Sequence, residues 1–235
     1  MESLHGKAAI VTGGTRGIGR AIAERLLRAG AFVAICGRSP ESTAKAVSEM
    51  KPLGNIYGCA ADVSDYGQVR ALFEAVDREL GRLDILVNNA GEGVFRKVGE
   101  MSPEEWHRNI DLNLNGPFYC SREALARFAG RGGFIVNISS LAGKNAFAGG
   151  AGYNASKAGL NLFSEAMMLD HRYDKVRVTS IMPGSVDTEF SGSNSGDASW
   201  KIAPEDIAET VAMIVKLPER TTISRVEMRP SRPKK

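Results

Sequence analysis

The sequence predicts an α/β fold, a single doubly wound parallel sheet of seven strands with helices on both faces. Three observations support this prediction. Strand-like and helix-like segments alternate from one end of the chain to the other, the strand-like segments are rich in Val and Ile, and they are apolar nearly throughout. Strands without polar alternation are typical of parallel sheets that helices cover on both faces.

The expected strands are short apolar runs, and they span residues 7–12, 31–37, 55–60, 83–91, 134–139, 176–184 and 222–228. Helical spacing of apolar residues predicts helices over 17–29, 40–51, 64–80, 153 to about 172, and 204–217. Another helix is expected to begin at Ser102, because Ser-Pro-Glu-Glu combines a capping box with proline at the first helical position. With right-handed crossovers, ligands bind at the carboxyl ends of such strands.

The length and composition indicate one folded domain. The chain has 235 residues, of which 43% are hydrophobic and 24% charged, a balance that excludes a disordered chain. We therefore expect a single domain over 1–235, with a basic tail from about residue 229. The longest apolar runs are too short to span a membrane, and the first residues lack signal-peptide character, so we expect a cytoplasmic protein.

The charge distribution argues against nucleic acid or a membrane as a partner. The formal net charge is +3, but four basic residues near the C-terminus carry +4, which leaves −1 for the rest of the chain. These residues are Arg229, Arg232, Lys234 and Lys235. Nucleic-acid binding needs a basic face on the folded domain. Cys36, Cys59 and Cys120 are scattered without a CxxC pair, so no metal site is expected.

A glycine-rich turn, Thr12-Gly-Gly-Thr-Arg-Gly-Ile-Gly19, lies between the first expected strand and the first expected helix. Glycines there permit a tight turn and close approach of the backbone to a ligand. The helix N-terminus offers free N–H groups and a partial positive charge to a pyrophosphate. A plain turn is the alternative, but the strand–turn–helix context favours a dinucleotide.

The residues after the second strand favour NADP(H) over NAD(H). An NAD site usually has an acidic residue there that accepts hydrogen bonds from the adenosine ribose. This chain instead reads Cys36-Gly-Arg-Ser39, with no carboxylate before Glu41. Arg38 could reach a 2′-phosphate, and Arg16 could approach the same group, since guanidinium matches phosphate geometry. The alternative is two solvated surface arginines.

Polar motifs follow the later strands. Asn88-Asn-Ala-Gly91 ends the fourth strand, Ser139-Ser140 ends the fifth, and Tyr153-Asn-Ala-Ser-Lys157 opens the long helix. Tyr and Lys four residues apart lie on one helix face. We expect the ammonium to lower the phenol pKa from about 10 toward neutrality, where proton transfer is most efficient. Taken alone, Tyr and Lys at this spacing would indicate only two neighbours on a helix surface. The ordered set of motifs instead favours a catalytic site.

With these motifs in this order, the chain resembles the short-chain dehydrogenase/reductase family from about residue 5 to about 230. The resemblance implies a Rossmann-type sheet, a nicotinamide cofactor and carbonyl/alcohol interconversion. By the family pattern, Tyr153 is the acid/base, Lys157 assists it and binds the nicotinamide ribose, Ser140 orients the substrate oxygen and Asn113 supports a proton relay. Cofactor binding is expected from Gly13, Thr15, Arg16, Gly17, Ile18, Gly19, Arg38, Asp62, Val63, Asn89, Ala90, Gly91, Tyr153, Lys157, Pro183, Gly184, Val186 and Thr188.

Two assignments required a choice between neighbours. Ser140 lies thirteen residues before Tyr153, the usual family spacing, so Ser139 is expected to face the cofactor or the core. Asp-Leu-Asn-Leu-Asn-Gly matches the family at Asn113, which leaves Asn115 without a chemical role.

The C-terminal segments Ala203-Pro-Glu-Asp-Ile-Ala and Ile223-Ser-Arg-Val-Glu-Met-Arg-Pro resemble NADP-dependent 3-hydroxy acid dehydrogenases. We therefore expect oxidoreduction of a small ketone, aldehyde or hydroxy/oxo acid. A 3-oxoacyl thioester reductase is the alternative, although such proteins usually end in a Gly-Gly segment that is absent here. A non-catalytic NADP-binding regulator is a further alternative, although it would be expected to lack Tyr153 or Lys157.

Several residues are candidates for the substrate pocket, namely Phe95, Phe147, Phe190 and Trp200, each of which could equally be ordinary packing, and Glu92 and Lys144, whose direction is open. Family resemblance also implies a homo-oligomer, with a tetramer favoured and a dimer possible. The long helix supports this weakly. Its apolar residues, Ala155, Ala158, Leu162, Phe163, Ala166 and Met167, cover more of its circumference than a one-sided core helix needs.

Overall fold

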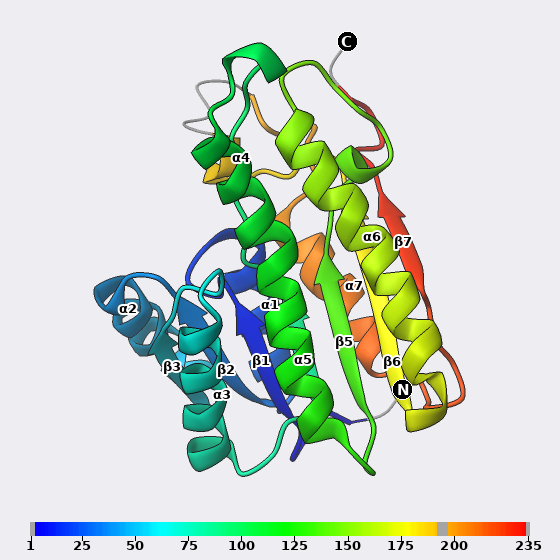
Figure 1. The fold of residues 1–235 in the computed structure, drawn as a ribbon. Coiled ribbons are helices and arrows are strands. Elements are labelled where there is room, and N and C mark those ends of the chain that lie inside the picture. Colours follow the sequence, from blue (N-terminus) through cyan, green and yellow to red (C-terminus); the bar gives the residue numbers. More distant parts are fainter. Residues whose placement is uncertain (1–2, 192–196, 234–235) are drawn as a thin grey trace.

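The computed structural model describes residues 3–191 and 197–233, and these residues form the expected sheet with helices on both faces (Figure 1). All pairings are parallel, and the strand order is β3-β2-β1-β4-β5-β6-β7. The predicted fold class is therefore confirmed. The strands are β1 (Ala8–Thr12), β2 (Phe32–Gly37), β3 (Ile56–Ala60), β4 (Ile85–Asn88), β5 (Gly133–Ile138), β6 (Val176–Pro183) and β7 (Arg225–Met228).

The helices divide between the two faces of the sheet. One face is covered by α1 (Gly17–Arg28), α2 (Pro40–Met50) and α7 (Pro204–Val215). The other is covered by α3 (Tyr66–Leu80), α5 (Gly116–Phe128) and α6 (Ala151–His171), with α4 (Pro103–Ile110) packed on α6.

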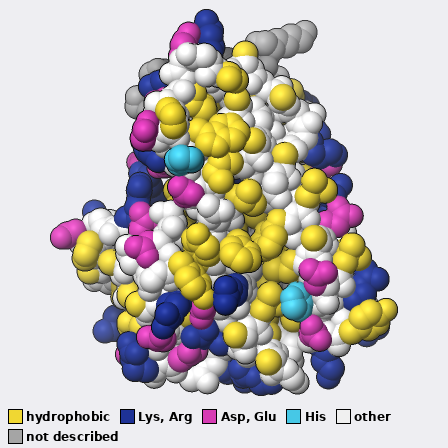
Figure 2. Space-filling view, viewed as in Figure 1, with side chains coloured by type: hydrophobic (Ala, Val, Ile, Leu, Met, Phe, Trp, Pro, Cys, Tyr) yellow, Lys and Arg dark blue, Asp and Glu magenta, His cyan; other side chains and the backbone are white. Residues whose placement is uncertain are grey.

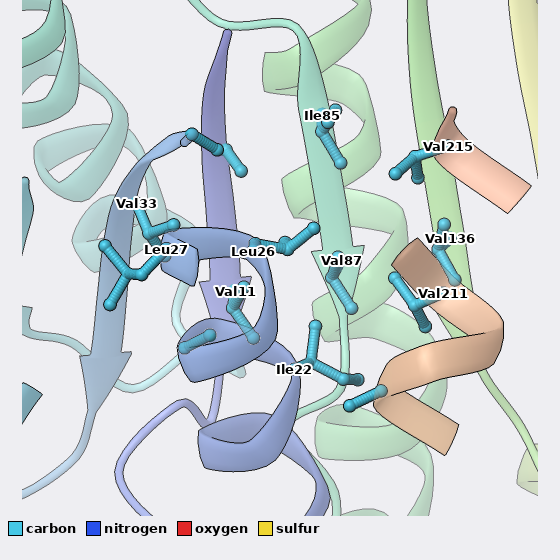
Figure 3. Close-up of a cluster of buried hydrophobic side chains, with 14 of the residues drawn as sticks. Val11, Ile22, Leu26, Leu27, Val33, Ile85, Val87, Val136, Val211 and Val215 are labelled. Atoms are coloured by element: carbon cyan, nitrogen blue, oxygen red, sulfur yellow. The ribbon is translucent and has the colours of Figure 1, made fainter. Parts of the chain in front are cut away.

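Alternating residues of each central strand supply the two apolar cores. Val11 of β1 belongs to the cluster under α1 and α7, whereas the adjacent Ile10 belongs to the cluster under α3 and α5. Figure 3 shows Ile22 and Leu26 of α1 and Val211 of α7 directed onto the strands. Both faces are thus buried, which explains why the strands read as continuous apolar runs.

The segment after Ser102 differs from a single helix. The capping box is present, because Ser102 accepts from the Glu105 N–H and Glu105 accepts from the Ser102 N–H. After α4 the chain makes a π-helical turn, Asp111–Asn115, before α5 continues. Pro117 lies in the first turn of α5, and it lacks the N–H that would bond the carbonyl of Asn113 in a regular helix.

The sheet has its switch point between β1 and β4, where successive crossovers leave in opposite directions. Side chains join the two strand ends. Asn89 Nδ2 donates to the carbonyls of Thr12 at 2.9 Å and Gly13 at 3.2 Å. Thr12 Oγ1 accepts from the backbone N–H groups of Asn89 and Ala90, each at 3.0 Å. We call this set of bonds the β1–β4 clamp.

The described part of the chain bears on several further expectations. It has no helix both long and apolar enough to cross a membrane, and no group of three or more potential metal ligands. Cys36 and Cys120 are buried free thiols whose pKa values are raised by burial. Of the basic tail, Arg229 bonds Glu227 at 2.9 Å, whereas Lys234 and Lys235 lie outside the described residues.

Hydrophobic side chains gather on the molecular surface over α5 and α6 (Figure 2). Phe118 of α5 is 44% exposed, and Leu162 and Leu169 of α6 are 69% and 51% exposed. Met167, by contrast, is buried in the core. The apolar residues of α6 therefore do serve two sides of that helix.

Candidate active site

A cavity of about 920 Å³ opens at the carboxyl ends of the strands. The loops after β1 to β6 all contribute to it. Of the predicted catalytic residues, Ser140, Tyr153 and Lys157 border this cavity, and Asn113 does not. Every predicted cofactor residue borders it except Gly19.

The glycine turn forms a cradle that side chains would fill. Gly13 has a φ of +64° and Gly17 a φ of +53°. A Cβ on Gly13 would lie 2.9 Å from Ala90 Cα, so this position requires the close approach of β1 and β4. A Cβ on Gly19 would lie 2.3 Å from Asn89 Nδ2. Gly19 therefore allows the first turn of α1 to pack closely against the β1–β4 clamp.

The first turn of α1 faces this cradle, and its N–H groups are ones that an α-helix leaves without intrahelical partners. Arg16 is the N-cap residue, and its side chain makes no capping hydrogen bond. Free N–H groups and the partial positive charge of a helix N-terminus suit a pyrophosphate. The turn thus fits the phosphates of a dinucleotide.

The two arginines expected at the 2′-phosphate are both exposed and both face carboxylates. Arg38 Nη2 lies 3.8 Å from Glu92 Oε2, and Arg16 Nη1 lies 3.4 Å from Glu189 Oε2. Exposed pairs of this kind contribute only about 0–1 kcal/mol, so an incoming phosphate can compete for either guanidinium. Glu92 is held more closely by Arg108, at 2.9 Å.

Two serines beside Arg38 were not identified from the sequence. Ser39 and Ser42 border the cavity, although Ser39 is also the N-cap of α2 and accepts from the Ser42 N–H. Their only sequence signal is their place just after β2, where an ordinary helix cap looks the same. Asp62 and Val63 border the same side, and the Asp62 carboxylate accepts from Ser64 Oγ at 2.7 Å.

Tyr153, Ser140 and Lys157 meet at the centre of the cavity. Tyr153 lies in the first turn of α6, one turn before Lys157, and Lys157 Nζ is 5.8 Å from the centre of the Tyr153 ring. The ammonium donates to the Ile138 carbonyl at 3.0 Å. Ser140 follows β5, and its hydroxyl accepts from the Ala142 N–H at 3.1 Å and lies near enough to the Tyr153 side chain to act on the phenol pKa.

Burial decides the pKa values of this pair. It lowers the pKa of Lys157 from 10.5 to about 8, because the ammonium loses hydration. Burial also raises the pKa of Tyr153, and the nearby Ser140 hydroxyl, which favours the ionised phenol, only partly offsets this. The expectation of a lowered phenol pKa is therefore wrong for this structure. The phenol of Tyr153 is therefore protonated at neutral pH.

The neighbouring serine and the two asparagines have structural contacts. Ser139 is buried, and its hydroxyl donates to the Lys157 carbonyl at 3.3 Å, so it packs against α6 while also bordering the cavity. The Asn113 amide bonds both backbone groups of Glu92, at 3.0 and 2.8 Å, and Ser156 Oγ at 3.2 Å. Asn115 bonds Asp111. The side chain of Asn113 thus ties the loop after β4 to α6.

Of the six residues considered for the substrate pocket, four border the cavity and two do not. The aromatic residues Phe95, Phe147, Phe190 and Trp200 all border the cavity. Glu92 and Lys144 do not: Glu92 pairs with Arg108, and Lys144 pairs with Glu227 of β7. Leu141, Ala142, Asn145 and Lys201 also border the cavity and carry no sequence signal that would single them out.

Comparison with known proteins gives a consistent family. A family model described as short chain dehydrogenase matches residues 7–198. A 3β-hydroxysteroid dehydrogenase of Mediterraneibacter gnavus is 37% identical over 86% of this chain and 74% of its own length. An uncharacterised oxidoreductase of Staphylococcus saprophyticus is 33% identical over 98% of this chain and all of its own.

Solved structures agree. An alcohol dehydrogenase of the archaeon Thermococcus sibiricus, complexed with 5-hydroxy-NADP, has a TM-score of 0.91 and 31% identity over 97% of this chain and 99% of its own. A metagenomic short-chain oxidoreductase in complex with NADP has a TM-score of 0.87 and 38% identity over 99% of this chain and all of its own. The chain therefore belongs to the short-chain dehydrogenase family and is an oxidoreductase that acts on CH–OH groups.

Proposed function

We propose that this protein uses NADP(H) to interconvert a carbonyl group and a secondary alcohol on a small ketone, aldehyde or hydroxy/oxo acid. The observation that carries the proposal is the meeting of the Tyr153 and Ser140 hydroxyls at the cavity, with Lys157 buried beside them. Two hydroxyls that converge beside a dinucleotide cradle suit a carbonyl oxygen that gains negative charge.

The proposed cofactor residues fit NADP(H). Gly13 and Gly17 leave room for the pyrophosphate, and Arg38, Arg16 and the two serines after β2 supply donors for a 2′-phosphate. Two relatives with solved structures were complexed with NADP or a derivative of it. No carboxylate stands at the end of β2, where an NAD ribose would be bound.

Each catalytic residue has a distinct part in the proposed reaction. When bound, the nicotinamide supplies or accepts the hydride. Ser140 binds the substrate oxygen, and Tyr153 donates its proton to that oxygen during reduction. Lys157 holds positive charge below the phenol, which stabilises the phenolate that remains. Asn113 supports the relay that returns a proton to Tyr153, because its side chain positions the loop after β4. Its backbone carbonyl is free of the usual i+4 helical donor, since that position is Pro117.

Replacement of Tyr153 by Phe tests the catalytic assignment. Tyr153→Phe keeps the ring and its packing but removes the proton, so turnover of a reducible ketone should fall by about 100-fold to 10,000-fold. NADPH affinity should remain near that of the wild type. Lys157→Met should lower both turnover and NADPH affinity. Steady-state kinetics and cofactor titration measure both quantities, and near-normal turnover of Tyr153→Phe would place the acid elsewhere.

The pKa of Lys157 predicts a pH dependence of stability. Its pKa is 10.5 when unfolded and about 8 when folded, so between these values the unfolded chain binds more protons. Wild-type protein should therefore gain about 3 kcal/mol of unfolding free energy relative to Lys157→Met as pH rises from 8 to 10.5. Below pH 8 the difference should be constant. Denaturant titrations measure this, and parallel pH profiles for the two proteins would contradict it.

Replacement of Arg38 tests the choice of cofactor. Arg38→Asp removes a guanidinium from the proposed phosphate site and introduces repulsion, so the Kd for NADPH should rise by about 10-fold or more. The Kd for NADH should change little. Arg220→Asp, an equal charge change in an exposed loop, is the control. Equal losses for both cofactors, or a wild-type preference for NADH, would show that the 2′-phosphate is not recognised here.

We also propose that the chain, as a single domain, forms a homo-oligomer, with a tetramer favoured and a dimer possible, and that the apolar surface over α5 and α6 takes part in the contact. Leu162 is 69% exposed on that surface, so Leu162→Glu should produce monomers in light scattering at micromolar concentration. Lys45→Glu on α2 is the control and should not change the mass. A monomeric wild-type protein would refute the proposal.

A further inference from the structure

The ring of Tyr153 is enclosed by aromatic side chains from separate loops. Phe95, from the loop after β4, meets it nearly edge-on at 75° with ring centres 5.6 Å apart. Phe190, from the turn Glu189–Ser191 after β6, meets it at 54° and 5.8 Å. Tyr153, the proposed proton donor, is therefore flanked by the rings of Phe95 and Phe190.

Two glycines and a bridge between the loops position these rings. Phe147 packs on Phe95 at 5.7 Å. A Cβ on Gly93 would lie 2.4 Å from the Phe95 ring, and a Cβ on Gly150 would lie 2.6 Å from the Phe147 ring. The two loops are joined by a parallel bridge, with the Arg96 N–H donating to the Gly149 carbonyl at 2.8 Å. Both rings thus occupy seats that only glycine leaves open.

These rings remain open to the cavity. Phe95, Phe147 and Phe190 are 37%, 46% and 43% exposed, and all three border the cavity. Apolar surface of this kind is stabilised when a ligand removes it from water. Aromatic ligands gain further from offset or edge contacts with such rings.

Cations close to this aromatic wall have acidic or carbonyl partners, and Arg16, which borders the cavity, pairs with Glu189 at 3.4 Å. Arg96 pairs with Glu105 at 3.4 Å, Arg108 pairs with Glu92 at 2.9 Å, and Lys144 pairs with Glu227. Lys157 donates to a backbone carbonyl beneath Tyr153. Burying a substrate carboxylate against phenylalanine, without a cation to pair with it, is unfavourable. Lys201 also borders the cavity.

We propose that the wall formed by Phe95, Phe147 and Phe190 selects uncharged carbonyl compounds whose carbonyl carbon carries an aromatic ring, in preference to free oxo acids and acyl thioesters. This inference rests on the proposed function and narrows it. It assigns Phe95 and Phe190 as specificity-determining residues, because both contact the ring of the proton donor.

Three ketones of similar size separate the contributions of charge and aromaticity. With NADPH, kcat/KM for acetophenone should exceed that for cyclohexyl methyl ketone by about 2-fold to 10-fold, the range of an aromatic pair contact. It should exceed that for 4-acetylbenzoate by at least about 10-fold, because the carboxylate loses hydration without gaining a partner. Acetoacetate and acetoacetyl-coenzyme A should be poorer than acetophenone.

Variants assign the preference to the wall. Phe95→Leu and Phe190→Leu keep apolar volume but remove a ring, so each should reduce the preference for acetophenone over cyclohexyl methyl ketone to within about 2-fold. Tyr173→Leu is the control, because Tyr173 is 91% exposed and does not border the cavity. Its substrate preference should equal that of the wild type. Lys201→Met should likewise leave the order of the ketones unchanged.

A binding measurement keeps the inference separate from the proposed reaction. Calorimetric titration of Tyr153→Phe with NADPH present should give a lower Kd for acetophenone than for the other two ketones, and adding Phe95→Leu should remove the difference. Absence of turnover with every ketone, aldehyde and hydroxy or oxo acid supplied would refute the proposed function and leave the titration to decide the inference. Equal or tighter binding of cyclohexyl methyl ketone or 4-acetylbenzoate, or no effect of Phe95→Leu and Phe190→Leu on the binding order, would overturn it.

Discussion

The β1–β4 clamp is the constraint on which the remainder of the site depends. At the switch point no crossover helix bridges the two strands, so side chains must join their ends. Asn89 bonds the carbonyls of Thr12 and Gly13, and Thr12 bonds the backbone of the loop after β4. That closeness makes glycine necessary at Gly13 and Gly19, and it brings the cradle of α1 beside the loop that leads to Phe95.

The burial of the Lys157 ammonium is electrostatically unfavourable, and the folded protein maintains it. Lys157 is 5% exposed and bonded to a backbone carbonyl, and the phenol next to it keeps its proton. A buried ammonium with a pKa of about 8 can exchange its proton with water at mildly alkaline pH. The end of β5 offsets part of the cost of burying Lys157, because the Ile138 carbonyl accepts a hydrogen bond from the ammonium. Ser140 follows two residues later, so the same strand positions both groups.

The sequence predicted the fold and the membership of the cavity well, since apolar strands and motif spacing are local signals. Strand ends were less accurate, as the fourth strand stops at Asn88 and leaves Asn89 to Gly91 in the loop. The pKa of Tyr153 was predicted in the wrong direction, because burial depends on tertiary packing. The direction of Lys144 toward β7 and the convergence of Phe95 with Phe190 join residues far apart in the chain, so no local pattern encodes them.

The most direct test of the central claim follows one hydrogen through one turnover. NADPH deuterated at the reactive face of nicotinamide C4 and acetophenone would be incubated with the protein in ordinary water, and the alcohol analysed by mass spectrometry and NMR. A carbonyl reductase should transfer the label as hydride from the cofactor and place one deuterium on the carbinol carbon of every product molecule. An alcohol with no deuterium from either face of the labelled cofactor, or with solvent hydrogen on carbon, would contradict the account.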